Sequence, residues 1–100
     1  MSFIVFIEPR ALTDIQKAMN YYDNCQTGLG KKFETVVDKH ILTISKNPFF
    51  QIRYNGVRCL PVKTFPFMIH FVIDEERNEV FIISVFHTSK NNNEWLINIE

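Results

Sequence analysis

The second half of the sequence offers four candidates for moving protons or holding phosphate: His87, Arg58, Lys63 and Lys90. His87 closes an apolar segment and precedes a polar one, so we expect it at the end of a strand, where a rigid scaffold presents the side chain. Because imidazole titrates near neutral pH, a histidine there can act as a general acid or base. The alternative interpretation is that His87 only hydrogen-bonds its own loop.

Positive charge gathers in the same part of the chain. From Arg53 to Lys90, with the turn at residues 74–79 excepted, the sequence carries Arg53, Arg58, Lys63 and Lys90 and no acidic residue. Charge-assisted hydrogen bonds from Arg58, Lys63 and Lys90 would hold a phosphate group or the carboxylates of a partner. The alternative is an ordinary solvated sheet face, because lysine and arginine are mostly exposed in any protein.

The composition limits the classes of protein that the chain can represent. With 100 residues, 46% of them hydrophobic, we expect one domain over residues 1–100. The 11 basic and 11 acidic residues give a net charge of zero, which excludes the strong basic excess of a general nucleic-acid binder. The longest apolar segment, Phe3 to Ile7, is too short for a membrane span or a signal peptide. We therefore expect a cytoplasmic protein with Cys25 and Cys59 reduced, and we predict no cofactor and no metal site.

Hydrophobic periodicity predicts the elements that must position the candidate residues. The first apolar segment reads as a strand buried on both faces, and helical spacing of apolar residues follows it twice. Glycines between the two helical segments predict a tight reversal and an antiparallel helical hairpin. The expected elements are a strand over residues 3–7, a helix from Ala11 or Asp14 to near Cys25, and a helix from Leu29 to Asn47-Pro48.

The rest of the chain predicts a sheet that covers the helical hairpin. Asn55-Gly56 is a strong signal for a β-hairpin, and a polar loop over residues 88–94 precedes an apolar anchor at Trp95. The expected strands span residues 50–54, 57–60, 67–73 and 79–87, and the last is central because it is apolar on both faces. The fold class is therefore α+β, in the order β-α-α-β-β-β(β), with a two-helix hairpin packed on a small, mainly antiparallel twisted sheet.

The order of these elements and several local motifs resemble the RelE/ParE superfamily, the toxins of bacterial type II toxin–antitoxin modules, often called plasmid stabilisation proteins. The similarity spans almost the whole chain and leans towards the ParE-like branch. It is carried by Ala11-Leu12-Thr13-Asp14-Ile15, Tyr21-Tyr22, Gly28-Leu29-Gly30 with Phe33, Ile44 with Asn47-Pro48, Val57-Arg58, Phe65-Pro66-Phe67, Val85-Phe86-His87-Thr88-Ser89-Lys90 and Trp95.

The resemblance implies a toxin that a cognate antitoxin neutralises by direct binding. Its ParE-like branch implies binding and poisoning of a large target such as DNA gyrase, which needs no catalytic residue. Its RelE-like branch implies a messenger RNA endoribonuclease that acts on the ribosome, with His87 as acid or base and Arg58, Lys63 and Lys90 steadying phosphate. A third implication is an inactive member that keeps only antitoxin binding. A large apolar face would also favour a homodimer of the free toxin.

The sequence departs from the family pattern near its end. Family members commonly carry arginine where this chain has Lys90, followed by Asp-Pro where it has Asn91-Asn92. Arginine grips phosphate with a planar fork, whereas lysine binds it as a point charge. Together with the neutral net charge, this departure favours the target-binding interpretation over the ribonuclease.

Overall fold

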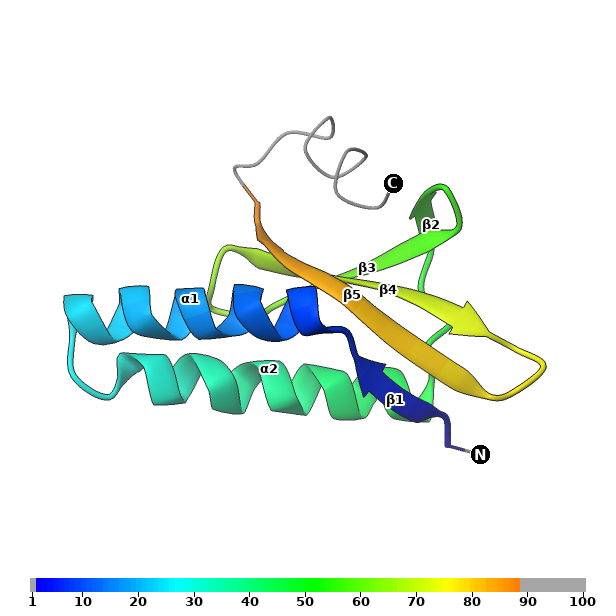
Figure 1. The fold of residues 1–100 in the computed structure, drawn as a ribbon, viewed down its shortest axis with the longest axis horizontal. Helices are drawn as coiled ribbons and strands as arrows, with labels where there is room; N and C mark the ends of the chain where they lie inside the picture. Colours follow the sequence, from blue (N-terminus) through cyan, green and yellow to red (C-terminus); the bar gives the residue numbers. More distant parts are fainter. Residues whose placement is uncertain (1, 89–100) are drawn as a thin grey trace.

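The computed structural model describes residues 2–88 and places two helices on one face of a five-stranded sheet (Figure 1). The strand order across the sheet is β1-β5-β4-β3-β2, in which β1 runs parallel to β5 and all other neighbours are antiparallel. The predicted α+β class is thus confirmed. The elements are β1 (Ile4–Ile7), α1 (Pro9–Cys25), α2 (Leu29–Lys46), β2 (Ile52–Tyr54), β3 (Val57–Pro61), β4 (Phe67–Asp74) and β5 (Glu79–His87).

Helix α1 begins earlier than the sequence predicted. Pro9 occupies its first turn and Glu8 is the N-cap residue. Proline suits this position because the N–H group that it lacks would have had no partner within the helix. The Thr13 hydroxyl donates to the carbonyl oxygen of Pro9 at 3.1 Å, so Thr13 lies inside the helix and does not cap it. The helix begins at Pro9, before either of the predicted starts, Ala11 and Asp14.

Two glycines shape the turn between the helices in different ways. Gly28 caps α2 with φ at 89°, in the left-handed region that favours glycine. Gly30 allows a close approach, because a Cβ atom there would collide with the backbone carbonyl oxygen of Met19. The Gly30 N–H donates to Asp23 Oδ1 at 2.8 Å. This contact ties the start of α2 to the end of α1 and confirms the antiparallel hairpin.

Strand β1 is an edge strand, and the prediction that it is buried on both faces was wrong. Val5 and Ile7 pack against the main core, whereas Ile4 and Phe6 are 60% and 43% exposed. The hydrophobic pattern of a short apolar segment does not distinguish a central strand from an edge strand that has one exposed face. The strand therefore leaves apolar side chains on the surface.

The Asn55-Gly56 turn joins β2 and β3 as the sequence predicted. Both residues have positive φ, 40° and 75°, which is the backbone of the two-residue hairpin turn that suits the twist of a sheet. The pairing contains an irregularity between Ile52 and Tyr54. Strand β2 spans Ile52–Tyr54, so it begins later than the predicted strand over residues 50–54.

Strand β5 lies between β1 and β4, which confirms its predicted interior position. Phe71 pairs with Ile82, and the preceding His70 pairs with Ser84, so Ile83 is an extra residue that forms a β-bulge. The extra residue shifts the alternation along the strand. As a result Val85, like Ile82, faces the helices, and the end of β5 is redirected toward α1.

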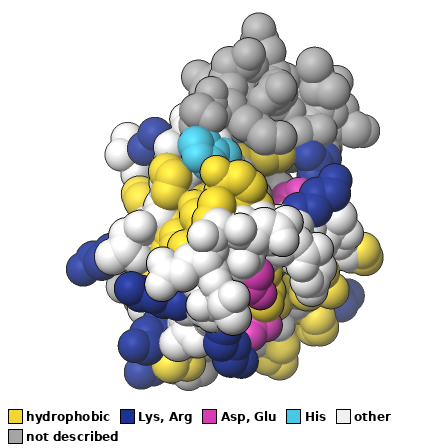
Figure 2. Space-filling model, turned by 90° about the vertical axis from the view of Figure 1, so that its left-hand side faces the viewer, with side chains coloured by type: hydrophobic (Ala, Val, Ile, Leu, Met, Phe, Trp, Pro, Cys, Tyr) yellow, Lys and Arg dark blue, Asp and Glu magenta, His cyan; other side chains and the backbone are white. Residues whose placement is uncertain are grey.

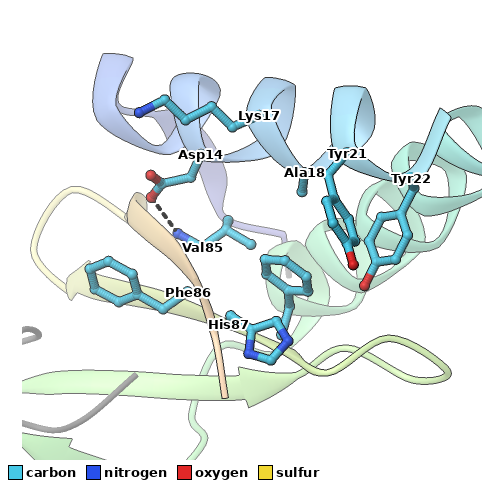
Figure 3. A pocket seen from close by; sticks show the side chains of 9 residues that line it. Asp14, Lys17, Ala18, Tyr21, Tyr22, Val85, Phe86 and His87 are labelled. Carbon is cyan, nitrogen blue, oxygen red and sulfur yellow. Dashed lines mark hydrogen bonds between the residues drawn. The ribbon is translucent and has the colours of Figure 1, made fainter. Parts of the chain in front are cut away.

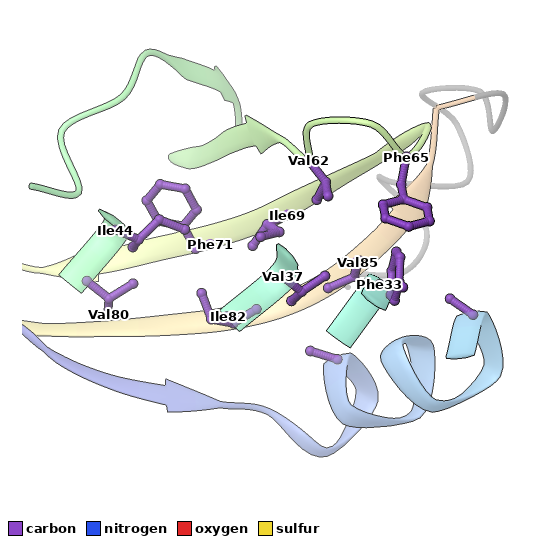
Figure 4. Close-up of a cluster of buried hydrophobic side chains, with 12 residues drawn as sticks. Phe33, Val37, Ile44, Val62, Phe65, Ile69, Phe71, Val80, Ile82 and Val85 are labelled. Atoms are coloured by element: carbon purple, nitrogen blue, oxygen red, sulfur yellow. The ribbon is translucent and has the colours of Figure 1, made fainter. Parts of the chain in front are cut away.

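The main core fills the space between the helical hairpin and the sheet (Figure 4). Phe33 from α2 is its aromatic centre, with the rings of Tyr22, Phe65 and Phe67 at 5.5, 5.1 and 5.1 Å. A smaller cluster of Cys59, Met68 and Phe86 lies on the opposite face of the sheet. Within residues 2–88, no helix is long and apolar enough to cross a membrane. The buried members of the main core are Ala11, Ala18, Phe33, Val37, Ile44, Val62, Phe65, Ile69, Phe71, Val80, Ile82 and Val85.

Candidate functional site

A groove of about 420 Å³ lies between helix α1 and the end of β5 (Figure 3). In the space-filling view, hydrophobic side chains gather beside a histidine at this end of the molecule (Figure 2). The groove combines aromatic walls with a few polar groups, which is the usual make-up of a binding site. The residues that line it are Asp14, Lys17, Ala18, Tyr21, Tyr22, Phe67, Val85, Phe86 and His87.

The groove exists because β1 is much shorter than β5. Pairing between the two strands ends at Ile7 and Ile82, and the Glu8 N–H makes a last bond to the carbonyl oxygen of Ile82 at 2.9 Å. The chain then enters α1, which passes beside β5 where a longer β1 would have continued. Asp14 Oδ2 accepts the next outward amide of β5, the N–H of Val85, at 2.9 Å. Beyond this bond the helix and the strand border the groove.

Aromatic rings form the walls of the groove. On the α1 side, Tyr21 is 63% exposed and meets the Tyr22 ring edge-on, with centroids 5.3 Å apart. Tyr22 is half-buried and packs against the main core. On the sheet side, Phe67 pairs with His87 across β4 and β5, and their ring centroids are 5.2 Å apart. The walls therefore offer apolar contact together with hydroxyl and imidazole groups.

Of the three predicted charged and acid–base candidates that the structure describes, His87 lines the groove, and Arg58 and Lys63 do not. His87 is half-buried at the end of β5, the position that the sequence predicted. Asp14 and Lys17 line the groove from α1, with Asp14 turned toward β5 and the Lys17 side chain running along the far side of the helix (Figure 3). Neither was singled out from the sequence as a site residue, because their place beside the groove depends on how α1 passes β5.

Arg58 lies away from the groove. Its register partner on β4 is Phe71, whereas the partner of His87 is Phe67. Four residues of extended strand separate those two positions by about 13 Å. The Arg58 guanidinium donates from Nη1 to the Phe50 carbonyl oxygen at 2.8 Å and lies over the Phe49 ring at 5.6 Å. These contacts hold the segment after α2 against β3.

Lys63 belongs to the loop between β3 and β4 and is exposed, but it is not among the groove residues. Its backbone N–H donates to His40 Nε2 at 3.2 Å, while His40 Nδ1 donates to the Val36 carbonyl oxygen at 2.7 Å. His40 thus links α2 to this loop. Lys90, the Asn91-Asn92 pair and Trp95 lie outside the described residues, so the proposed phosphate-holding roles stay predictions.

A buried polar cluster lies on the opposite face of the sheet. His70 is fully buried, and its Nδ1 stands 2.8 Å from the Tyr54 hydroxyl and 3.5 Å from Cys59 Sγ. Burial, and secondarily the charge of Arg53, lower the pKa of His70 to about 4. Burial also raises the pKa of Tyr54 to about 12 and that of the Cys59 thiol to about 11. The three groups are therefore neutral at pH 7, which suits a structural role.

The described residues hold no metal centre, since residues 2–88 contain no group of three or more His, Cys, Asp or Glu side chains placed to bind an ion. The two cysteines in this range are free; Cys25 is exposed and Cys59 is buried. The described residues that line the groove offer aromatic rings, two tyrosine hydroxyls, one carboxylate, one amine and one imidazole.

Solved structures with the same arrangement of helices and strands come from toxin–antitoxin systems. A chain of the chromosomal ParDE system from P. aeruginosa matches with a TM-score of 0.78 at 14% identity, over 88% of this chain and 98% of that one. A chain of the RelBE2 toxin–antitoxin complex from Mycobacterium tuberculosis matches with a TM-score of 0.62 at 18% identity, over 90% and 95%. The isolated E. coli RelE toxin matches with a TM-score of 0.66 at 14% identity, over 99% and 100%.

These likenesses define the class of fold. The chain has the fold that the ParDE and RelBE systems share, as the resemblance of its sequence implied. No model of a protein family matches the sequence, and no curated protein sequence matches it either. The relation is therefore visible in the arrangement of the elements rather than in overall sequence identity.

Proposed function

We propose that the chain is the toxin component of a type II toxin–antitoxin module and that an antitoxin neutralises it by direct binding. The fold supports this proposal, because its structural relatives are chains of systems described as ParDE and RelBE toxin–antitoxin complexes. The observation that carries it is the open groove between α1 and β5. A preformed groove with aromatic walls suits the capture of a segment of another protein.

The groove is the proposed antitoxin site. Tyr21 is 63% exposed there. Tyrosine is enriched in protein interfaces, so an exposed tyrosine in a groove suits contact with a partner. Ala18, one turn before Tyr22 on the same helix, is small and keeps the centre of the groove open. Lys17 at the rim would select an acidic residue of the partner. An apolar segment with an acidic neighbour is therefore the expected occupant.

The favoured mode of action is ParE-like binding and poisoning of a large target, for which DNA gyrase is the precedent in the resembling family. This mode needs no catalytic group. It is supported by the separation of Arg58 from His87 and by the TM-score of 0.78 to the ParDE chain. We also propose that the protein acts in the cytoplasm, where such targets lie.

The alternative mode is a RelE-like messenger RNA endoribonuclease that works on the ribosome. His87 supports it, since an imidazole that opens to a groove can exchange a proton with a ribose hydroxyl or a leaving oxygen. Arg58, Lys63 and Lys90 would then steady phosphate. A third possibility, an inactive member that retains antitoxin binding, would keep the groove but no target surface.

Controlled expression in a bacterial host separates the three modes. The wild-type chain, His87→Ala and Arg58→Ala are each expressed alone while growth, ribosome-associated mRNA 5′ ends and DNA breaks are recorded. Target poisoning predicts growth arrest with DNA breaks, intact messages and full activity of His87→Ala. Codon-phased mRNA cuts that disappear in His87→Ala would instead establish the ribonuclease. Unimpaired growth, together with binding to the product of the neighbouring small gene, would identify the inactive member.

A further inference from the structure

Strand β1 forms one edge of the sheet and lacks the charges, the prolines and the bulge that protect many natural sheet edges from pairing. The segment Phe3–Ile7 contains no charged residue and no proline, and its pairing with β5 shows no bulge. Ile4 and Phe6 are 60% and 43% exposed, and Phe6 stacks on Phe81 with ring centroids 5.3 Å apart. The net charge of zero adds no long-range repulsion between copies of the chain.

The backbone hydrogen bonds show which groups of β1 face outward. The N–H groups of Ile4 and Glu8 donate toward β5, to Asn78 and Ile82, both at 2.9 Å. Because successive residues of a strand direct their backbone groups to opposite sides, Val5 and Ile7 present theirs on the outer side. On either side of this pair, Phe3 and Pro9 have no N–H group available to donate on the outer side.

The flanking residues limit the pairing to the centre of the strand. The N–H of Phe3 already donates to the carbonyl oxygen of Ser45 at the end of α2, at 2.7 Å. Pro9 has no N–H group. The outward donors of this edge are therefore those of Val5 and Ile7, which are two residues apart.

We propose that β1 is the contact of a homodimer, in which it pairs antiparallel with β1 of a second copy about a two-fold axis beside Phe6. In this register Val5 of one copy stands opposite Ile7 of the other, and each such pair exchanges both hydrogen bonds. A shift of two residues in either direction would set Val5 against Pro9 or Ile7 against Phe3 and lose donors. The edge is thus complementary to itself in one register.

Side chains add to the match. Phe6 faces Phe6 of the second copy as the non-hydrogen-bonded pair, in which side chains approach most closely. Glu8 of one copy stands opposite Ile4 of the other, beside Phe3, which Ser45 ties to the end of α2. Glu8, like Ile4 and Phe6, is exposed on the face of β1 that is turned away from the helices.

Disulfide trapping tests this register on the intact chain. In a background with the exposed Cys25 replaced by serine, Phe6→Cys places two thiols across the axis at a Cα separation of about 4.5 Å, which suits a disulfide. We expect Phe6→Cys to form covalent dimers under mild oxidation. Ile4→Cys, on the same exposed face, should not react with itself, but an equal mixture of Ile4→Cys and Glu8→Cys should yield the mixed dimer.

Sedimentation equilibrium supplies the second measurement. The wild-type chain should show a dimer whose fraction grows with concentration, and Phe6→Lys should weaken association at least tenfold while circular dichroism stays unchanged. The trapping assay introduces no charge, so it decides the matter even where Phe6→Lys does not fold. A wild-type chain that stays monomeric at every concentration would overturn the proposal. So would crosslinking of Ile4→Cys, or of Ile52→Cys on the opposite edge, as fast as that of Phe6→Cys.

Discussion

The carboxylate of Asp14 accepts the backbone N–H of Val85 at 2.9 Å, although the two residues are 71 positions apart in the sequence. The bond gives a backbone amide of β5 an acceptor beyond the end of β1, where β5 has no neighbouring strand on that side. It also fixes the end of β5, with His87 two residues further on, against the first half of α1. Asp14 thus holds α1 against β5 at one end of the groove.

Replacement of Asp14 should therefore loosen the groove. Asp14→Ala leaves the partly buried Val85 N–H without its acceptor and should lower the free energy of unfolding by about 1–3 kcal/mol. Asp14→Asn keeps a carbonyl acceptor of the same size and should cost less. Urea unfolding measures both effects, and faster hydrogen exchange at the Val85 amide would locate them. Equal losses for the two variants would contradict the role of the hydrogen bond.

Gly30 should resist replacement by alanine more than Gly28 does. An added methyl group at Gly30 meets the Met19 carbonyl and the Asp23 carboxylate, so the helices must separate, at a cost of about 1–3 kcal/mol. At Gly28 the added methyl group has open space, and the left-handed backbone alone costs about 1–2 kcal/mol. Thermal unfolding of Gly30→Ala, Gly28→Ala and Gly28→Asn compares the two costs. Little loss in Gly30→Ala would rule out the close helix contact.

Because of His70, the free energy of unfolding should fall in mild acid. Its pKa is lowered from 6.5 to about 4 on folding, mainly by burial, so the folded state disfavours the protonated ring. The stability contributed by the neutral ring is complete above pH 6.5 and is lost as the pH falls from there to about 4. The total loss is on the order of 3 kcal/mol.

His70→Gln is the matched control for this pH dependence, because glutamine does not titrate and still offers Tyr54 a hydrogen-bond partner. Urea unfolding of both proteins between pH 4 and 7 gives the slope of stability against pH. The variant should lose most of the acid-induced drop that the wild-type chain shows. Parallel curves for the two proteins would assign the drop to other groups.

The sequence predicted most of the elements but not how they meet. The helical spacing and the Asn55-Gly56 signal are local patterns, and the helices and the hairpin were found where those patterns lie. The edge position of β1 was missed because a short apolar run has no decisive period. The bulge at Ile83 and the contact between Asp14 and Val85 depend on pairing between distant segments. No local sequence motif predicts the bulge or this contact.

The candidate site was predicted in part for the same reason. His87 was expected at a strand end and is found there, beside the groove. Arg58 was expected to hold phosphate or a partner's carboxylates, and it does lie on the side of the sheet that faces the helices, but the length of β4 keeps it from the groove. Lys17 and Tyr21 lie at the groove only because α1 passes beside the end of β5, which no local sequence pattern predicts.

The most direct test of the central claim is neutralisation through the groove. The chain is expressed with and without the product of the neighbouring small gene, as wild type, as Tyr21→Asp and as Leu12→Asp. Tyr21 and Leu12 are both exposed on α1, at 63% and 53%, but only Tyr21 lines the groove. We predict growth arrest by all three proteins alone, with relief by the neighbour for wild type and Leu12→Asp and none for Tyr21→Asp. Equal relief of all three, or no arrest by the wild-type chain, would contradict the account.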